Sequence, residues 1–145
     1  MPTFYFDVAH AIHTHDHVLE LSGGMAGVLN AGQLASALDH IQNDEYYPSF
    51  EEKLTHLVWA VAKFHCFSDG NKRSSIALGA HFLELNGYGC FGAHFIREME
   101  NIVVWVAEGR ISKELLHRLV SALCVGEEFD EGLKLDLIDA LGGLP

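Results

Sequence analysis

Residues 65–73 read HCFSDGNKR, and this stretch interrupts an apolar pattern that has helical spacing on either side. Apolar residues recur at helical intervals over 54–62 before the stretch and over 76–83 after it. The stretch therefore joins the end of one buried helix to the start of the next. We expect its last residue, Arg73, in the first turn of the second helix, where free backbone N–H groups and the helix dipole attract anions.

Helical spacing continues along almost the whole chain, which predicts an all-α fold. Asp7 can cap a first helix and Ser112 the last main helix, while Asn30 and Gln33 have the spacing of a capping box. Residues 43–50 are polar and aromatic and predict a loop or a short β-hairpin. The predicted fold class is thus a compact helical bundle with at most one small hairpin.

Length and composition indicate one folded domain. The 145 residues, 49% of them apolar, are enough to bury a core. No apolar run approaches the roughly 20 residues of a membrane-spanning helix, and residues 1–7 lack the basic patch of a secretory signal. The three cysteines are odd in number and form no CxxC pair, which favours a reducing compartment. We therefore expect a cytoplasmic protein that does not bind membranes.

The end of the chain differs in composition from the rest. Residues 1–125 form the predicted domain, and residues 126–145 form an acidic C-terminal tail. In this tail the acidic residues of 127–131 precede regularly spaced leucines and an isoleucine. The pattern fits either a short amphipathic helix or a partly frayed segment.

The net charge of −11 argues against a nucleic-acid partner, whose phosphates would be repelled. Only nine residues are basic, and Lys72 and Arg73 are the one adjacent pair. Two neighbouring cations beside a histidine in an acidic chain indicate a small local anion site. A nucleotide pocket is such a site.

Four residues of the 65–73 stretch suit phosphate binding. Gly70 permits positive φ and a close approach of ligand to backbone. Asn71 offers an amide donor. Lys72 supplies a point charge, and Arg73 can bind phosphate oxygens in a fork.

The same stretch holds a carboxylate and a base. Asp69 can hold Mg²⁺ together with water and phosphate oxygens, and His65, four residues earlier, can accept a proton from a hydroxyl. Together these parts indicate phosphoryl or nucleotidyl transfer. The alternative is a structural turn with solvated cations. Phe67 is interpreted as a core anchor of the loop rather than a stacking platform.

The stretch resembles the HxFx(D/E)(G/A)N(G/K)R signature of the Fic/Doc family, and Lys72 brings it closer to the Doc (death-on-curing) branch. The similarity runs from about residue 5 to about residue 124. It includes His15-Asp16, Gly23-Gly24 and the segment 108–112. It implies a compact helical fold with a β-hairpin flap that aligns a target peptide. Tyr46 and Tyr47 lie where that flap is expected.

The resemblance also implies roles for individual residues. His65 is the general base that deprotonates the target hydroxyl, and Asp69 positions Mg²⁺. Gly70, Asn71 and Arg73 bind the phosphates of the ATP co-substrate. Phe67, outside the reaction itself, packs the loop into the core.

Three positions are compared with the family pattern, and two of them, Lys72 and Gly70, bear on the type of reaction. Cys66 stands where family members often have proline, and this position does not contact the ligand. Lys72 replaces the second glycine of AMPylating members, which favours transfer of the γ-phosphate. Gly70 keeps the glycine that the Doc prototype replaces with alanine, so the sequence is intermediate between the two branches.

The sequence thus predicts a Doc-like toxin that moves the γ-phosphate of ATP to a Ser or Thr hydroxyl of a cytoplasmic protein, such as a translation elongation factor. The first alternative is AMP transfer by the same loop, and the second is a non-catalytic binding module with the same fold. No Ser or Thr has Glu four residues later, as the family's inhibitory helix requires. We therefore expect a separate antitoxin partner.

Overall fold

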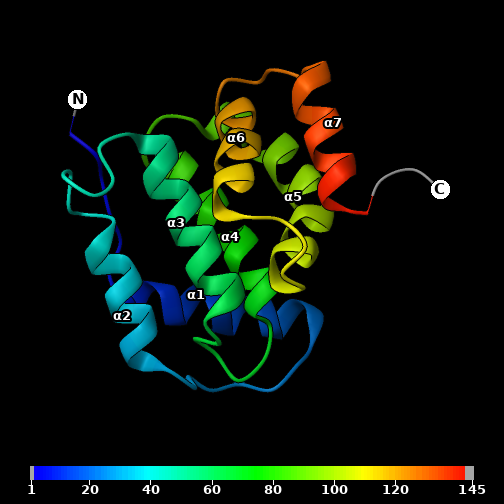
Figure 1. Cartoon of the computed structure of the whole chain (residues 1–145). Helices are drawn as coiled ribbons and strands as arrows, with labels where there is room; N and C mark the ends of the chain where they lie inside the picture. The colour runs from blue at the N-terminus through cyan, green and yellow to red at the C-terminus, as the bar shows by residue number, and fades with distance from the viewer. Residues whose placement is uncertain (1, 143–145) are drawn as a thin grey trace.

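The computed structural model describes residues 2–142 and is helical throughout, as the sequence predicts. None of its helices is long and apolar enough to cross a membrane. Within the described residues the elements are α1 (Val8–Ser22), α2 (Ala31–His40), α3 (Phe50–Lys63), α4 (Asn71–Leu85), the 3₁₀ turn η1 (Gly89–Phe91), α5 (Gly92–Ala107), α6 (Lys113–Cys124) and α7 (Glu131–Ala140) (Figure 1).

The helices α3 and α4 form the centre of the molecule. Most residues of α3 are buried, and α2, α4, α5 and α6 all pack against it. Figure 1 shows α6 in front of this pair and α1 across its lower end. Fully buried side chains such as Leu57 and Phe82 each contribute about 1.5–3 kcal/mol through the apolar surface they remove from water. The rigid α3–α4 pair therefore fixes both ends of the loop that joins them.

Two of the predicted helix caps are confirmed and one is wrong. Asp7 accepts a hydrogen bond from the backbone N–H of His10, and Ser112 accepts one from Leu115. Asn30 does precede α2, but its side chain makes no cap. It donates instead to the carbonyl of His65 at 3.1 Å, because the loop after α3 passes beside it.

The predicted β-hairpin flap at Tyr46 and Tyr47 is wrong. Residues 43–48 form turns, and the described part of the chain contains no strand, only one isolated β-bridge elsewhere. Side chains of α3 hold this segment: the buried ammonium of Lys53 lies 2.6 Å from Asp44, and Tyr47 stacks on His56. These contacts fold the segment onto α3, so it cannot project as a hairpin.

The acidic tail forms a helix that packs on α6. Asp130 caps α7 by accepting from the N–H of Leu133, whose side chain is buried. Arg118 of α6 forms an ion pair with Asp136 of α7. Of the two expectations for the tail, the amphipathic helix is therefore the one observed.

We predict that Lys53→Met destabilises the fold by about 1–3 kcal/mol, because the buried carbonyl of Ile41 loses the ammonium that donates to it at 2.7 Å. Urea unfolding measures the change, and Lys134→Met at an exposed lysine of α7 is the matched control. Equal midpoints for the two variants would contradict the prediction.

We also predict that acid destabilises the protein through His56. Burial, the Lys113 ammonium and His40 lower the pKa of His56 to about 4. Below about pH 6.5 the unfolded chain binds a proton at His56 that the folded chain does not bind. The free energy of unfolding therefore decreases as the pH falls from about 6.5 to about 4. Between pH 7 and pH 4.5 the free energy of unfolding should decrease by about 2–3 kcal/mol more in the wild type than in His56→Gln. An equal decrease in the wild type and in His56→Gln would disprove the assignment of this pH dependence to His56.

Candidate active site

The loop between α3 and α4 borders a cavity of about 330 Å³. One wall comes from the loop and the start of α4, and the other from the ends of α3 and α5. The cavity brings together five residues singled out from the sequence, namely His65, Asp69, Gly70, Asn71 and Lys72. The facing wall consists of Ala62, Lys63, Val104, Ala107 and Glu108. The predicted reactive residues thus share one hollow.

Other residues singled out from the sequence lie elsewhere. Tyr47 lines a separate cavity of about 380 Å³ between α3 and α6, where its hydroxyl lies 3.0 Å from Nδ1 of His56. Tyr46 is largely exposed in the turns before α3. Phe67 is fully buried, and its ring anchors the loop in the core. The larger cavity therefore contains none of the loop chemistry.

The backbone of the loop is strained at its start. His65 has φ of 50°, the one positive value at a non-glycine residue in the described part of the chain. Such a conformation is rare and persists where surrounding contacts enforce it. Asn30 supplies two of those contacts, from its side chain to the carbonyl of His65 and from its backbone N–H to that of Cys66, both at 3.1 Å. The exposed imidazole of His65 is thus set on a fixed backbone.

Asn71 closes the loop on itself. Its side-chain nitrogen donates to the carbonyl of Phe67 at 2.9 Å, and its side-chain oxygen accepts from the N–H of Phe67 at 3.0 Å. Both polar atoms of the amide are therefore engaged with the loop backbone. In this structure Asn71 shapes the site with its side chain.

Asp69 is held by backbone donors on both oxygens. Oδ2 accepts from the N–H of Met25 at 3.0 Å, and Oδ1 accepts from the N–H of Gly70 at 2.8 Å. These two hydrogen bonds, with a smaller contribution from Arg73, lower the pKa of the carboxyl group. The side chain remains 47% exposed, so an ionised carboxylate faces solvent at the cavity.

This donor set fits Mg²⁺. Within residues 2–142 no three His, Cys, Asp or Glu side chains gather into a ready-made metal cage. Mg²⁺ is commonly held by one or two carboxylates, with waters and substrate phosphates in its other positions. Asp69 is the carboxylate that would hold it here.

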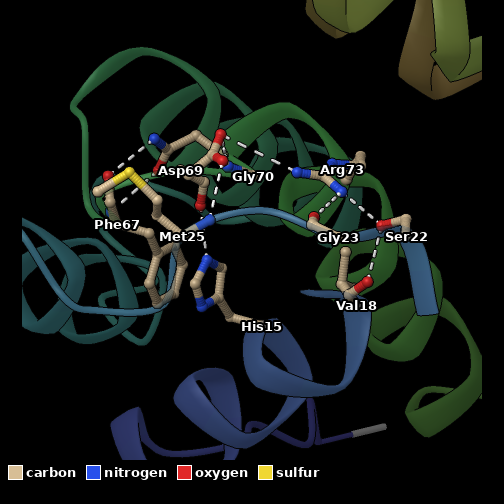
Figure 2. A network of polar contacts seen from close by, with 10 residues as sticks. His15, Val18, Ser22, Gly23, Met25, Phe67, Asp69, Gly70 and Arg73 are labelled. Carbon is tan, nitrogen blue, oxygen red and sulfur yellow. Dashed lines mark hydrogen bonds and ion pairs between the residues drawn. The ribbon is translucent and has the colours of Figure 1, made fainter. Parts of the chain in front are cut away.

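Arg73 lies against the end of α1 and is not among the residues that line the cavity (Figure 2). Its guanidinium donates to the hydroxyl of Ser22 and to the carbonyl of Gly23. Its Nη2 lies 4.0 Å from Oδ1 of Asp69. A cation at the C-terminus of α1 compensates the negative end of that helix. The structure therefore places Arg73 behind the carboxylate.

Residues 24–30 run beside the loop and pair with its backbone. Val28 forms a β-bridge with Phe67. The N–H of Leu29 donates to Cys66 at 2.9 Å, and that of Ser68 donates to Gly27 at 3.0 Å. This pairing between distant segments has no signal in the apolar spacing, so sequence reasoning missed it.

A histidine of α1 also reaches the loop. The ring of His15 stacks on Phe67 at 3.8 Å between centroids and 5° between planes, and its Nε2 lies 2.6 Å from the carbonyl of Asp69 (Figure 2). The sequence marks His15 only as part of a resemblance. Its contact with Asp69 spans 54 positions, and helical spacing gives no sign of it.

A helical domain with this loop at the start of a central helix defines the class of Fic-type proteins. The family model described as the Fic/DOC family matches residues 5–83, more than half of the chain. The chain therefore belongs to the Fic/DOC family, which confirms the resemblance read from the sequence. It is similar to the protein kinase doc of Escherichia phage P1, with 31% identity over 105 residues, 70% of this chain and 80% of that protein.

We predict that Gly24→Ala destabilises the protein more than Gly23→Ala. Both glycines have positive φ, and backbone conformations of this rare kind cost an alanine about 1–3 kcal/mol. A Cβ at Gly23 meets open space, whereas one at Gly24 would lie 2.8 Å from Oδ2 of Asp69 and 3.0 Å from Arg73. Crowding of this kind adds roughly 1–3 kcal/mol.

Thermal unfolding of the two variants side by side separates backbone strain from crowding. Equal melting temperatures would contradict the crowding that the structure indicates between a Cβ at Gly24 and the Asp69 carboxylate.

Proposed function

We propose that this protein is a Doc-like toxin that transfers the γ-phosphate of ATP to a Ser or Thr hydroxyl of a target protein. The observation that carries the proposal is the single cavity shared by His65, Asp69 and the start of α4. Similarity to a protein kinase supports phosphate as the transferred group. In the reaction the hydroxyl oxygen bonds to the γ-phosphorus, the bond to the β-phosphate oxygen breaks, and ADP leaves.

His65 is the proposed general base. Its imidazole is exposed and lines the cavity, so an incoming hydroxyl can reach it. A positioned base of this kind typically accelerates proton transfer by about 10²–10⁴-fold. The proton of the target hydroxyl passes to His65 as the oxygen attacks phosphorus.

The start of α4 and Lys72 are the proposed phosphate site. The first N–H groups of α4 have no partner within the helix and lie at the positive end of its dipole. Gly70 precedes them with φ of 74°, a backbone conformation that favours glycine. Lys72 is the cation of the motif that lines the cavity, so it is the one placed to meet a phosphate there.

Asp69 is the proposed carboxylate for Mg²⁺, which when bound neutralises charge on the phosphates. Arg73, packed behind Asp69, supports the carboxylate and anchors the loop to α1. The protein's own part in the reaction is thus to orient the phosphates, fix the carboxylate and accept a proton.

The target is proposed to dock on residues 24–30. This segment pairs with the reactive loop and carries exposed apolar side chains at Met25 and Leu29. By resemblance to the Doc branch, the proposed target is a translation elongation factor in the cytoplasm, and the proposed partner is a separate antitoxin that covers the site.

AMP transfer is the second candidate, and Gly70 is the observation that favours it. A Cβ at this position would lie 3.1 Å from Leu19 and 3.3 Å from Arg73. The loop retains the glycine of AMPylating members, and the same base can deprotonate a hydroxyl that attacks the α-phosphate.

We predict that purified protein labels a discrete target in cell extract from γ-labelled ATP and not from α-labelled ATP, in the presence of Mg²⁺. His65→Ala should lower the labelling about 10²–10⁴-fold, because the base is lost. His13→Ala, at an exposed histidine of α1, is the matched control and should label like the wild type.

Label from the α-phosphate alone would replace phosphate transfer by AMP transfer. Label from neither position, with elongation factor and extract both supplied, would favour the non-catalytic binding module. Labelling that survives His65→Ala would remove His65 from the reaction.

A further inference from the structure

We propose that His15 is a positioning residue of the active site, which holds the Asp69–Gly70 peptide so that the Asp69 carboxylate is fixed for a cation. The proposal rests on the proposed function only for its kinetic consequence. The contact itself is independent of the reaction.

The position of His15 is defined by two contacts. Its side chain is fully buried in α1. One face of the ring lies flat on Phe67, with centroids 3.8 Å apart, and Nε2 lies 2.6 Å from the carbonyl oxygen of Asp69. A stack and a hydrogen bond together leave the ring one orientation. His15 therefore connects α1 directly to the reactive loop.

The carbonyl of Asp69 determines the tautomer of His15. A carbonyl only accepts, so Nε2 carries the proton and donates it. The other nitrogen, Nδ1, is buried, has no hydrogen-bond partner among the described residues, and lies 3.6 Å from the nearest carboxylate oxygen of Asp16. A phenylalanine would stack on Phe67 without an unpaired polar atom. Packing alone therefore does not explain a histidine here, whereas donation to Asp69 does.

The hydrogen bond from His15 controls the orientation of a whole peptide group. The carbonyl of the Asp69–Gly70 peptide accepts a hydrogen bond from His15. The N–H of the same peptide belongs to Gly70 and donates to Oδ1 of Asp69 at 2.8 Å. A Cβ on Gly70 would lie 3.6 Å from Nε2, so the imidazole sits directly beside this peptide. Without the His15 donor the carbonyl of this peptide loses its partner, and rotation of the peptide would take the Gly70 N–H away from the carboxylate.

The same face of α1 supports the rest of the loop. His15, Leu19 and Ser22 follow at helical intervals of four and three residues. The side chain of Leu19 lies beside Gly24 and Gly70. The hydroxyl of Ser22 accepts a hydrogen bond from the guanidinium of Arg73. This face of α1 is therefore a platform under the loop, and His15 is its hydrogen-bonding contact with the residue that holds the metal.

The test uses two substitutions that divide the properties of the imidazole. His15→Phe keeps a ring on Phe67 and removes the donor, whereas His15→Gln keeps an N–H donor at the place of Nε2 and removes the ring. His13→Phe, at an exposed position of the same helix, is the matched control.

The first readout is the rate of phosphate transfer at increasing Mg²⁺, normalised to folded protein. Loss of a residue that orients a metal ligand typically costs about 10–100-fold in metal affinity or activity. We expect His15→Phe to raise the half-saturating Mg²⁺ concentration by that factor, with His15→Gln and His13→Phe close to wild type. A purely structural role would lower stability and leave the Mg²⁺ dependence unchanged, and that result would overturn the proposal.

The second readout needs no turnover. Calorimetric titration with Mg²⁺ and ATP in a His65→Ala background should show the same loss for His15→Phe and recovery for His15→Gln. Equal affinities would overturn the positioning role even in a protein that transfers phosphate. Absence of transfer in the wild type would contradict the proposed function alone, since the titration still tests His15.

The third readout applies even if His15→Phe does not fold, because it does not use that variant. Histidine ¹⁵N spectra of the wild type, with His15 assigned from its absence in the His15→Gln spectrum, should show Nε2 protonated and Nδ1 unprotonated at neutral pH. The opposite tautomer, with Nδ1 protonated and Nε2 without a proton, would overturn the proposal.

Discussion

The pair of hydrogen bonds between Asn71 and the backbone of Phe67 is the constraint on which the site depends. These bonds close the loop at the point where α4 begins, while burial of the Phe67 ring fixes the loop to the core. With its middle buried and its end closed, the loop must turn its remaining polar groups outward. His65 and Asp69 therefore reach the same cavity because the residues around them are tied down.

The predictions from sequence succeeded where the decisive contact is local. The side chains of Asp7 and Ser112 each accept a hydrogen bond from the N–H group three residues later. Asp and Ser are typical helix caps, so the residue types alone predict these contacts. The hairpin predicted within 43–50 is wrong because the ammonium of Lys53 binds Asp44 and holds the segment on α3, a contact that neither the composition of the segment nor the family resemblance indicates. In the site, the residues that face the cavity could be predicted, whereas the orientation of Arg73 could not, because its acceptors lie about fifty positions earlier in α1.

Local charge outweighs net charge at the cavity. A chain of net charge −11 repels a polyphosphate at long range, but charges on the surface are screened beyond about 8 Å in physiological salt. Within that distance a phosphate in the cavity would meet Lys63, Lys72 and the positive end of α4. The opposing charges are Glu108 on the facing wall and the Asp69 carboxylate beside α4, which is the group proposed to hold Mg²⁺. The acidic surface and the anion site are thus compatible.

Several unfavourable features of this structure lie around the loop between α3 and α4. His65 holds a positive φ that disfavours a non-glycine residue, and the buried Nδ1 of His15 has no hydrogen-bond partner within residues 2–142. Gly24 and Gly70 each occupy positive φ where a Cβ would press on Arg73. A turn whose task is only to connect α3 to α4 needs none of these, since ordinary turn residues reverse a chain without strain. Strain and unpaired polar atoms persist where the surrounding structure over-determines them, and they concentrate at reactive sites. The distribution of these costs therefore argues for chemistry at the loop and against the structural turn.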